Sequence, residues 1–254
     1  MHRTVNQDAA FTASWGGAVA DGVGGGPAGD LASAAFVHRL AAGRGSLPVD
    51  AETLAVSVRT ANWDLRAHVE RDPALSGMAT TFTGVFVSEA DTLLLAHTGD
   101  SRAYLLRDGQ LTQQTRDDSY VQVLVDRGLV REEDAASHPR RNLITASLSG
   151  GERDRVTVVE HDARPGDRWV LCSDGLSDYV PHADIEEVVA SHEHAADAAQ
   201  AAVALGLAAG TRDNVTVVVC DVEVGDVAPA IAPRPHTSFY GAAAARFTEG
   251  LETA

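Results

Sequence analysis

Five short motifs, each placing an aspartate where a predicted strand stops, constrain this chain more than any other feature. They are RTVNQD ending at Asp8, ADGVGG around Asp21, TGDSR around Asp100, CSDGL around Asp174 and TRDNV around Asp213. Strand ends are rigid and gather at one edge of a sheet, so side chains there can converge on a point. Converging carboxylates repel one another, and a hard divalent cation with oxygen ligands and retained waters relieves that repulsion. The motifs therefore predict a metal centre built from aspartates.

Any one of these motifs alone is also consistent with ordinary turn chemistry, since Asp-Gly and Gly-Asp are common in turns. Asp108-Gly109 is interpreted in that way, as the tip of a hairpin between 103–106 and 111–114. A glycine that follows an aspartate lets the backbone approach closely, so that its carbonyl can also act as a ligand. The order and spacing of all five motifs carry the metal hypothesis.

Hydrophobic periodicity predicts helices that come in pairs between groups of adjacent strands. Helices are expected over 30–41, 52–70, 118–127, 182–190 and 193–207, and strands over 81–87, 92–97, 103–106, 111–114, 156–160, 169–172 and 215–220. This order differs from the strict alternation of a parallel doubly wound sheet and favours antiparallel strands. Residues 226–254, rich in Ala and Pro, are expected to form a flexible tail, in which 242–251 could form a short helix.

Composition excludes several classes of function. The formal net charge of −16 repels nucleic-acid phosphate, which argues against a DNA or RNA partner. No run approaches the ~20 apolar residues of a membrane span, and no basic region followed by an apolar run opens the chain, so we expect a cytoplasmic protein. Cys172 and Cys220 each lie in an apolar run and are interpreted as buried free thiols.

Seven segments in register carry a resemblance to a known family: RTVNQD, ADGVGG, GMATT at 77–81, HTGDSRAYLLRDGQLTQQT, DDSYVQVLVDRG, CSDGLSDYV and TRDNVTVVV. Over residues 3–222 the chain resembles the bacterial metal-dependent serine/threonine phosphatases of the protein phosphatase 2C (PP2C, or PPM) family. The resemblance implies an α+β, four-layer αββα sandwich of two antiparallel sheets flanked by helices. It implies a catalytic domain over 1–225, with a flap at about 117–150, and the tail predicted from composition follows it over 226–254.

The resemblance also implies a role for each matching residue. Asp21 bridges two ions and Gly22 contributes its carbonyl, while Asp174 and Asp213 complete the first metal site. Asp100 supports a weaker third ion together with Asp174. Two further positions belong to the catalytic set: Asp8, which reaches the ions through water, and Arg3, which binds the substrate phosphate with its paired donors.

The implied activity is hydrolysis of phosphoserine and phosphothreonine by direct attack of a water that bridges two Mn²⁺ or Mg²⁺ ions about 4 Å apart. That mechanism needs no nucleophilic side chain, so Ser101 and Ser173 are interpreted as structural. The implied partners are phosphorylated proteins and a bacterial serine/threonine kinase, with no nucleic acid and no membrane, and the protein is expected to be a monomer.

Departures from the family pattern leave alternatives open. Many eukaryotic relatives carry a histidine, a candidate general acid, where this chain has Val23. The flap reads Asp117-Asp118-Ser119 where the family often has Asp-His-Ser, and the flap arginines contact either a phosphoprotein or only solvent. Relatives have a strand before the early arginine, so either that strand is missing or one sheet edge is exposed. A pseudophosphatase-like regulatory binding module on the same fold is the alternative function.

A dinucleotide-binding enzyme is a weaker alternative. Residues 24–29 match G-x-G-x-x-G, and Asp50 follows about 20 residues later. That interpretation needs a strand leading into Asp50, and GRGSLPV at 43–49 is a poor strand.

Overall fold

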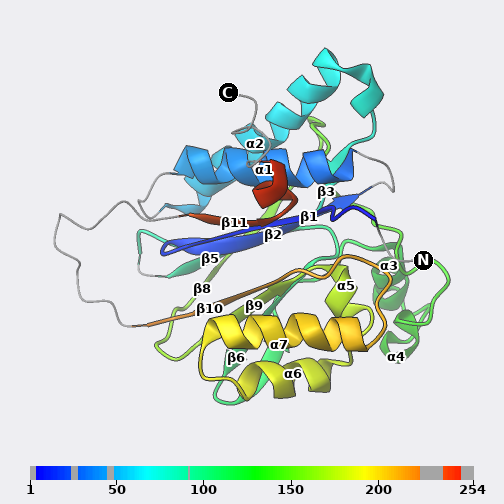
Figure 1. The fold of residues 1–254 in the computed structure, drawn as a ribbon. Coiled ribbons are helices and arrows are strands. Elements are labelled where there is room, and N and C mark those ends of the chain that lie inside the picture. The colour runs from blue at the N-terminus through cyan, green and yellow to red at the C-terminus, as the bar shows by residue number, and fades with distance from the viewer. Residues whose placement is uncertain (1–3, 24–27, 45–48, 91, 224–236, 247–254) are drawn as a thin grey trace.

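Two antiparallel β-sheets lie face to face in the computed structural model, and helices cover the outer surface of each (Figure 1). The structure describes residues 4–23, 28–44, 49–90, 92–223 and 237–246. Within these ranges no helix is both long and apolar enough to cross a membrane. The four layers confirm the αββα sandwich expected from the sequence.

The first sheet has seven strands in the order β11-β1-β2-β4-β5-β8, with β3 paired to β2. Its strands are β1 (Asp8–Ala13), β2 (Gly16–Val23), β3 (Ala79–Thr80), β4 (Phe82–Val87), β5 (Leu93–Thr98), β8 (Thr157–His161) and β11 (Ser238–Gly241). Helices α1 (Gly29–Arg44) and α2 (Ala51–Arg71) cover its outer face, and the short 3-10 turn η1 (Pro73–Leu75) follows α2. Asp50 caps α2 through a hydrogen bond from the Thr53 backbone N–H to its Oδ1, 2.7 Å long.

The second sheet has four strands in the order β10-β9-β6-β7. They are β10 (Val217–Asp221), β9 (Arg168–Cys172), β6 (Arg102–Arg107) and β7 (Gln110–Gln113), and the helices on this side are α5 (Asp174–Ser177), α6 (His182–Ala190) and α7 (Ala195–Ala208). The hairpin between β6 and β7 turns at Asp108 and Gly109, whose φ angles are 54° and 79°. Two successive positive φ angles are typical of the type I′ turn, so this Asp-Gly pair is turn chemistry, as the sequence predicts.

Alternate residues of each inner strand pack into different cores, because successive side chains of a strand point to opposite faces. Leu105, Trp169 and Leu171 lie in the core between the two sheets, together with Val19 and Val85 of the first sheet. Their strand neighbours pack on the helix side of the second sheet, against α5, α6 and α7: Tyr104, Val170 and Cys172. A third core fills the space between the first sheet and helices α1 and α2. Both cysteines are free thiols.

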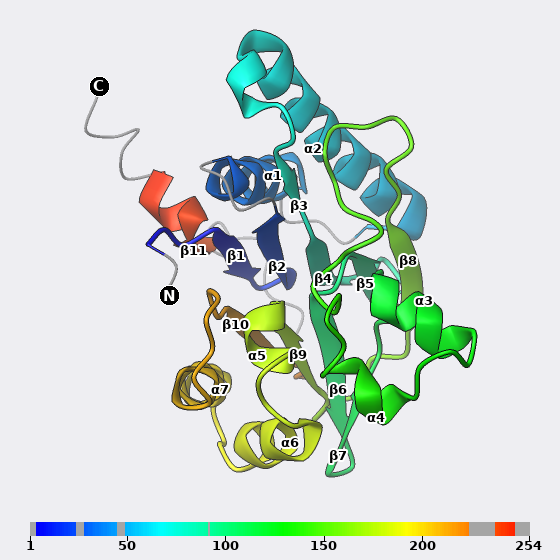
Figure 2. The same ribbon diagram turned by 90° about the vertical axis from the view of Figure 1, so that its right-hand side faces the viewer.

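A segment with little strand structure projects from one side of the sandwich and contains α3 (Tyr120–Asp126) and α4 (Glu132–Ala135) (Figure 2). We call residues 117–150 the flap. Single bridges close its two arms onto each other at Ser119 and Ile144, and onto β3 at Thr80 and Leu148. Its outgoing end is held on α2 by Asn62, whose Oδ1 accepts a hydrogen bond of 2.8 Å from the Gly150 N–H.

The structure corrects the expectation of a flexible tail for residues 237–246. Here β11 pairs with β1 in register, with Ala9 opposite Gly241, and covers the sheet edge beside β1. The following helical turn buries Ala242 and Ala243 against the core of the first sheet. Pairing with β1 supplies hydrogen-bond partners for the backbone of this segment. The alanine-rich sequence gives no sign of that pairing. The rest of the predicted tail lies outside the described residues.

Candidate metal centre

The first two aspartates face each other across one strand pair. Asp8 begins β1, and Asp21 lies directly opposite it near the end of β2. The sequence analysis places Asp8 where a strand stops, and the structure corrects this: β1 starts there. Because β1 and β2 are antiparallel, the start of one and the end of the other share the same sheet edge. Directly opposed residues in such a pair have Cβ atoms about 5 Å apart.

Asp8 is buried, with 1% of its surface exposed. The Ser173 hydroxyl donates to its Oδ2 at 2.8 Å, and the same hydroxyl accepts from the Thr216 backbone N–H at 3.1 Å. Burial raises the pKa of Asp8 to about 6, although the bond from Ser173 opposes this change. Ser173 therefore ties β1 to the second sheet through the carboxylate, which is a structural role.

The backbone around Asp21 is fixed by two threonines that precede β4. The Thr81 hydroxyl accepts from the Asp21 N–H at 3.0 Å, the Thr81 N–H donates to the Asp21 carbonyl at 2.8 Å, and the Thr80 hydroxyl donates to the same carbonyl at 3.0 Å. Thr81 in turn shares a hydrogen bond of 2.8 Å with the buried hydroxyl of Ser101. Asp21 is thus held rigidly with respect to the loop that carries Asp100.

Two glycines beside the aspartates permit close approach of separate backbone segments. A Cβ on Gly22 would lie 2.2 Å from the Gly29 carbonyl oxygen, and one on Gly175 would lie 1.8 Å from the Asn214 carbonyl oxygen. Both distances are far below van der Waals contact, so any side chain would force the segments apart. The Gly22 contact holds the end of β2 against the start of α1, next to Asp21.

Asp100 and Asp174 follow the ends of β5 and β9. Asp100 comes after Gly99, whose φ of +104° turns the chain sharply out of β5. Asp174 is the first residue of α5, where the positive end of even a short helix favours a carboxylate. Burial, with the charges of Asp117 and Asp178, raises the pKa of Asp100 to about 7. The pKa of Asp174 is also raised well above its usual range, mainly by burial and secondly by the charge of Asp100.

Asp213 lies in the loop between α7 and β10, before a strand and not after one. Its Oδ1 accepts a hydrogen bond of 2.9 Å from the Asn214 N–H. The Asn214 Oδ1 accepts a bond of 2.9 Å from the Gln7 N–H, which joins this loop to the start of β1. Asp213 thus approaches the edge that carries Asp8 from the second sheet.

The five aspartates act on one another electrostatically. The pKa of Asp21 is raised well above its usual range. Burial is the largest cause, and the charges of the other four aspartates add to it: Asp8, Asp174, Asp100 and Asp213. Two carboxylate oxygens of these five aspartates are buried and have no hydrogen-bond partner among the described residues, Asp8 Oδ1 and Asp174 Oδ1. Buried charge of one sign with unpartnered oxygens is unfavourable unless a cation is present. The structure therefore brings all five predicted aspartates together.

The donor set fits hard divalent cations that keep part of their water. Among the described residues, no group of three or more His, Cys, Asp or Glu side chains is arranged to hold an ion by itself. Carboxylates can shift one another's pKa over longer distances than those that join a metal to its ligands. The raised pKa values and the absence of a preformed ligand group are therefore compatible if water supplies many of the ligands. Mg²⁺ binds in this way, through one or two carboxylates and several waters, and Mn²⁺ also suits oxygen ligands.

Sequence reasoning missed two carboxylates beside Asp100. Asp178 follows α5, and its Oδ2 lies 3.4 Å from the Nε of Arg141 in the flap. Asp117 accepts two parallel hydrogen bonds from Arg102, one from Nε to Oδ1 at 3.0 Å and one from Nη2 to Oδ2 at 2.7 Å. The spacing of four residues between Asp174 and Asp178 was a usable signal, since residues at that spacing share a helix face.

Arg3, the predicted phosphate ligand, lies outside the described residues. Val23 is the last residue of β2 and its side chain carries no titratable group, so the position two residues after Asp21 supplies no acid. The serines interpreted as structural, Ser101 and Ser173, are both buried and hydrogen-bonded within the framework.

Comparison with known proteins places these features in a family. The serine/threonine protein phosphatase PstP of Mycobacterium tuberculosis is 43% identical over 236 residues, covering 91% of this chain and 45% of that protein. The serine/threonine phosphatase stp of Listeria innocua is 32% identical over 209 residues, 80% of this chain and 82% of its own length. The chain thus spans slightly less than half the length of PstP.

Solved structures agree with the sequence comparison. A crystal structure of Mycobacterium tuberculosis PstP superposes with a TM-score of 0.83 at 43% identity, covering 88% of this chain and 95% of that one. The PstP catalytic domain in complex with two manganese ions gives 0.81 at 41% identity, over 88% and 94%. Residues 2–208 match the family described as Protein phosphatase 2C. With this match, the αββα sandwich and the clustered aspartates, the chain belongs to the protein phosphatase 2C family.

Proposed function

We propose that this chain is a metal-dependent phosphatase that removes phosphate from phosphoserine and phosphothreonine in proteins. The observation that carries the proposal is the convergence of five aspartates from both sheets at one buried edge, with carboxylate oxygens left without partners. The family and the named relatives support the same activity. The manganese ions of the PstP structure support Mn²⁺ as the cofactor, with Mg²⁺ equally suited to oxygen ligands.

The proposed roles follow the positions of the side chains. Asp21 and the Gly22 carbonyl, together with Asp174 and Asp213, would hold two ions, and Asp100 with Asp174 would support a third. Bound there, the ions would lower the pKa of a water and offset the charge of the phosphoryl group.

The chain's own residues position that chemistry. Thr80 and Thr81 fix the backbone of Asp21, and Ser173 orients Asp8 towards its neighbours. The catalytic role of Asp8 is proposed to be indirect, through water, because one of its oxygens is already bonded to Ser173. Arg3 remains the residue predicted to bind the substrate phosphate.

The test is release of phosphate from a phosphothreonine peptide in the presence of Mn²⁺. We expect a chelator, or the substitution Asp21→Asn, to lower the rate at least a hundredfold. Asp108→Asn is the matched control, since it changes the same side chain at a hairpin tip where Asn also tolerates a positive φ. Full activity in Asp21→Asn, or turnover without metal, would contradict the mechanism. Phosphopeptide binding without turnover would favour the pseudophosphatase alternative.

The proposed function also implies substrates, a partner enzyme and a cellular location. Phosphorylated proteins are the substrates that the relatives support, and a bacterial serine/threonine kinase acting on the same proteins is the proposed partner. We also propose a monomer in the cytoplasm. The proposed catalytic domain takes in residues 237–246, because β11 completes the first sheet.

A further inference from the structure

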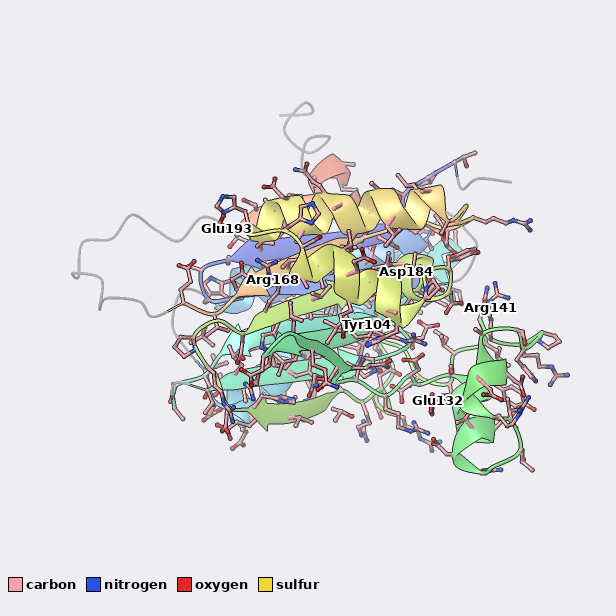
Figure 3. The ribbon with its side chains drawn as sticks, turned by 90° about the horizontal axis from the view of Figure 1, so that it is seen from below. Tyr104, Glu132, Arg141, Arg168, Asp184 and Glu193 are labelled. Atoms are coloured by element: carbon pink, nitrogen blue, oxygen red, sulfur yellow. The ribbon has the colours of Figure 1, made fainter. Side chains whose placement is uncertain are left out.

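A cleft of about 590 Å³ opens beside the metal centre, between the flap and the second sheet. Asp100 and Asp178 line it at the metal end, and Glu132 lines it from α4 of the flap. Figure 3 shows Glu132 and Arg141 on the flap and Tyr104 on the second sheet across from them. The volume lies within the range of sites that hold small ligands or a few side chains, about 300–1,000 Å³.

Part of the inner wall of the cleft is apolar. This part is formed by four buried side chains: Tyr104, Val121, Val180 and Ile185. They come from β6, from α3 of the flap, and from α6 with the segment before it. The rest of the lining is polar and includes Gln113, Thr115 and Ser177. The apolar part can contact the hydrocarbon stem of a long side chain whose polar head lies elsewhere.

The arginines that line the cleft are already paired with carboxylates. Arg102 makes its parallel hydrogen bonds to Asp117, and Arg116 forms an ion pair with Asp126. Arg141 lies against Asp178. These pairs leave little unneutralised positive charge to attract an anion.

Glu132 differs from its neighbours in this respect. The adjacent Glu133 and Asp134 both form ion pairs with Arg131, whereas Glu132 has no ion-pair partner among the described residues. Its exposed carboxylate therefore lines a partly apolar cleft without a cation. A ligand with an apolar stem and a positive head matches both features.

We propose that this cleft receives a lysine or arginine side chain of the substrate, close in sequence to the phosphorylated residue, with its head at Glu132 and its stem along Tyr104. The proposal rests on the proposed phosphatase function. An extended peptide advances about 3.3 Å per residue. A cleft that starts at Asp100 is thus within reach of side chains one to three residues from the phosphate.

The test compares phosphothreonine peptides that are identical except for one position, which carries Lys, Gln or Glu and is moved through the three residues on each side. With Mn²⁺ present, we expect Lys at one of these positions to raise kcat/KM about fivefold over Gln, equivalent to about 1 kcal/mol, and Glu to lower it. Glu132→Lys should reverse this order. Glu133→Lys is the control, because it makes the same charge change on the same helix outside the cleft.

The outcomes separate the two proposals. p-Nitrophenyl phosphate has no flanking residues, and its hydrolysis should be equal in the wild type and both variants. Peptide turnover that ignores the flanking residue, or an equal effect of Glu132→Lys and Glu133→Lys, overturns the cleft proposal and leaves the phosphatase function intact. Absence of metal-dependent turnover on every substrate overturns the function itself. Both glutamates are exposed, so neither variant is expected to impair folding.

Discussion

The metal-free protein should lose stability as the pH rises from about 4 to about 7, and Asp8 allows the size of the effect to be worked out. Burial raises the pKa of Asp8 from 3.8 to about 6. Between these values the unfolded chain releases the proton while the folded chain keeps it. The unfolded state therefore binds fewer protons, and the free energy of unfolding falls as the pH increases. Stability from this group is fully present below pH 3.8 and is lost by about pH 6.

The expected loss from Asp8 is about 3 kcal/mol, at about 1.4 kcal/mol for each tenfold change in proton affinity. For a chain of this size, that corresponds to a fall in Tm of about 6–12 °C. The pKa values of Asp21, Asp100 and Asp174 are raised in the same direction and add to the fall. Exposed carboxylates titrate as well, so the wild type alone does not isolate the effect.

The substitution Asp8→Asn isolates the contribution of Asp8, because the amide keeps the shape of the carboxyl group and stays neutral at every pH. Its carbonyl oxygen can still accept the hydrogen bond from Ser173. Urea unfolding of chelator-treated protein at pH 4, 5, 6 and 7.5 should show that the variant loses about 3 kcal/mol less than the wild type. Saturating Mn²⁺ should reduce the difference between the pH values, since a cation favours the ionised carboxylates. The reasoning would be falsified if both metal-free proteins showed the same pH dependence.

Three further substitutions test separate parts of the site. Asp174→Asn should abolish the rise in Tm that Mn²⁺ causes in the wild type, measured by thermal unfolding with and without metal; an unchanged rise would show that Asp174 is not a ligand. Gly22→Ala should cost about 2–3 kcal/mol in urea unfolding, because the added methyl would overlap the Gly29 carbonyl, and a cost below about 0.5 kcal/mol would refute the close packing there. Thr81→Val leaves the Asp21 N–H without its acceptor and should cost about 1–2 kcal/mol. Thr81→Ser should restore most of that stability, and equal stability of the Val and Ser variants would contradict the role of the hydroxyl.

Local patterns predicted most of the helices and strands. The helix expected over 52–70 is observed as Ala51–Arg71, and the one expected over 182–190 has those same bounds. Both follow apolar residues at spacings of three and four, which one buried face is enough to produce. The hairpin at Asp108 was predictable because a type I′ turn is specified by two adjacent residues.

Pairing between distant segments was not predictable in the same way. Strand β1 begins at Asp8, and the sequence analysis did not identify it, because DAAFTA lacks the alternation of a half-buried strand. Strand β11 pairs with β1 across more than 220 residues of chain. Asp117 and Asp178 became neighbours of Asp100 only because the flap and α5 fold over the end of β5.

By itself, the sequence determined which residues could build the centre: aspartates, most of them next to glycines, in an order and spacing shared with a known family. The tertiary structure decided that these aspartates meet. Antiparallel pairing places Asp8 opposite Asp21, and packing of the two sheets brings Asp174 and Asp213 to the same edge. Spacing along the chain cannot determine such proximity, because burial and mutual repulsion depend on distances between segments that only the folded protein brings together.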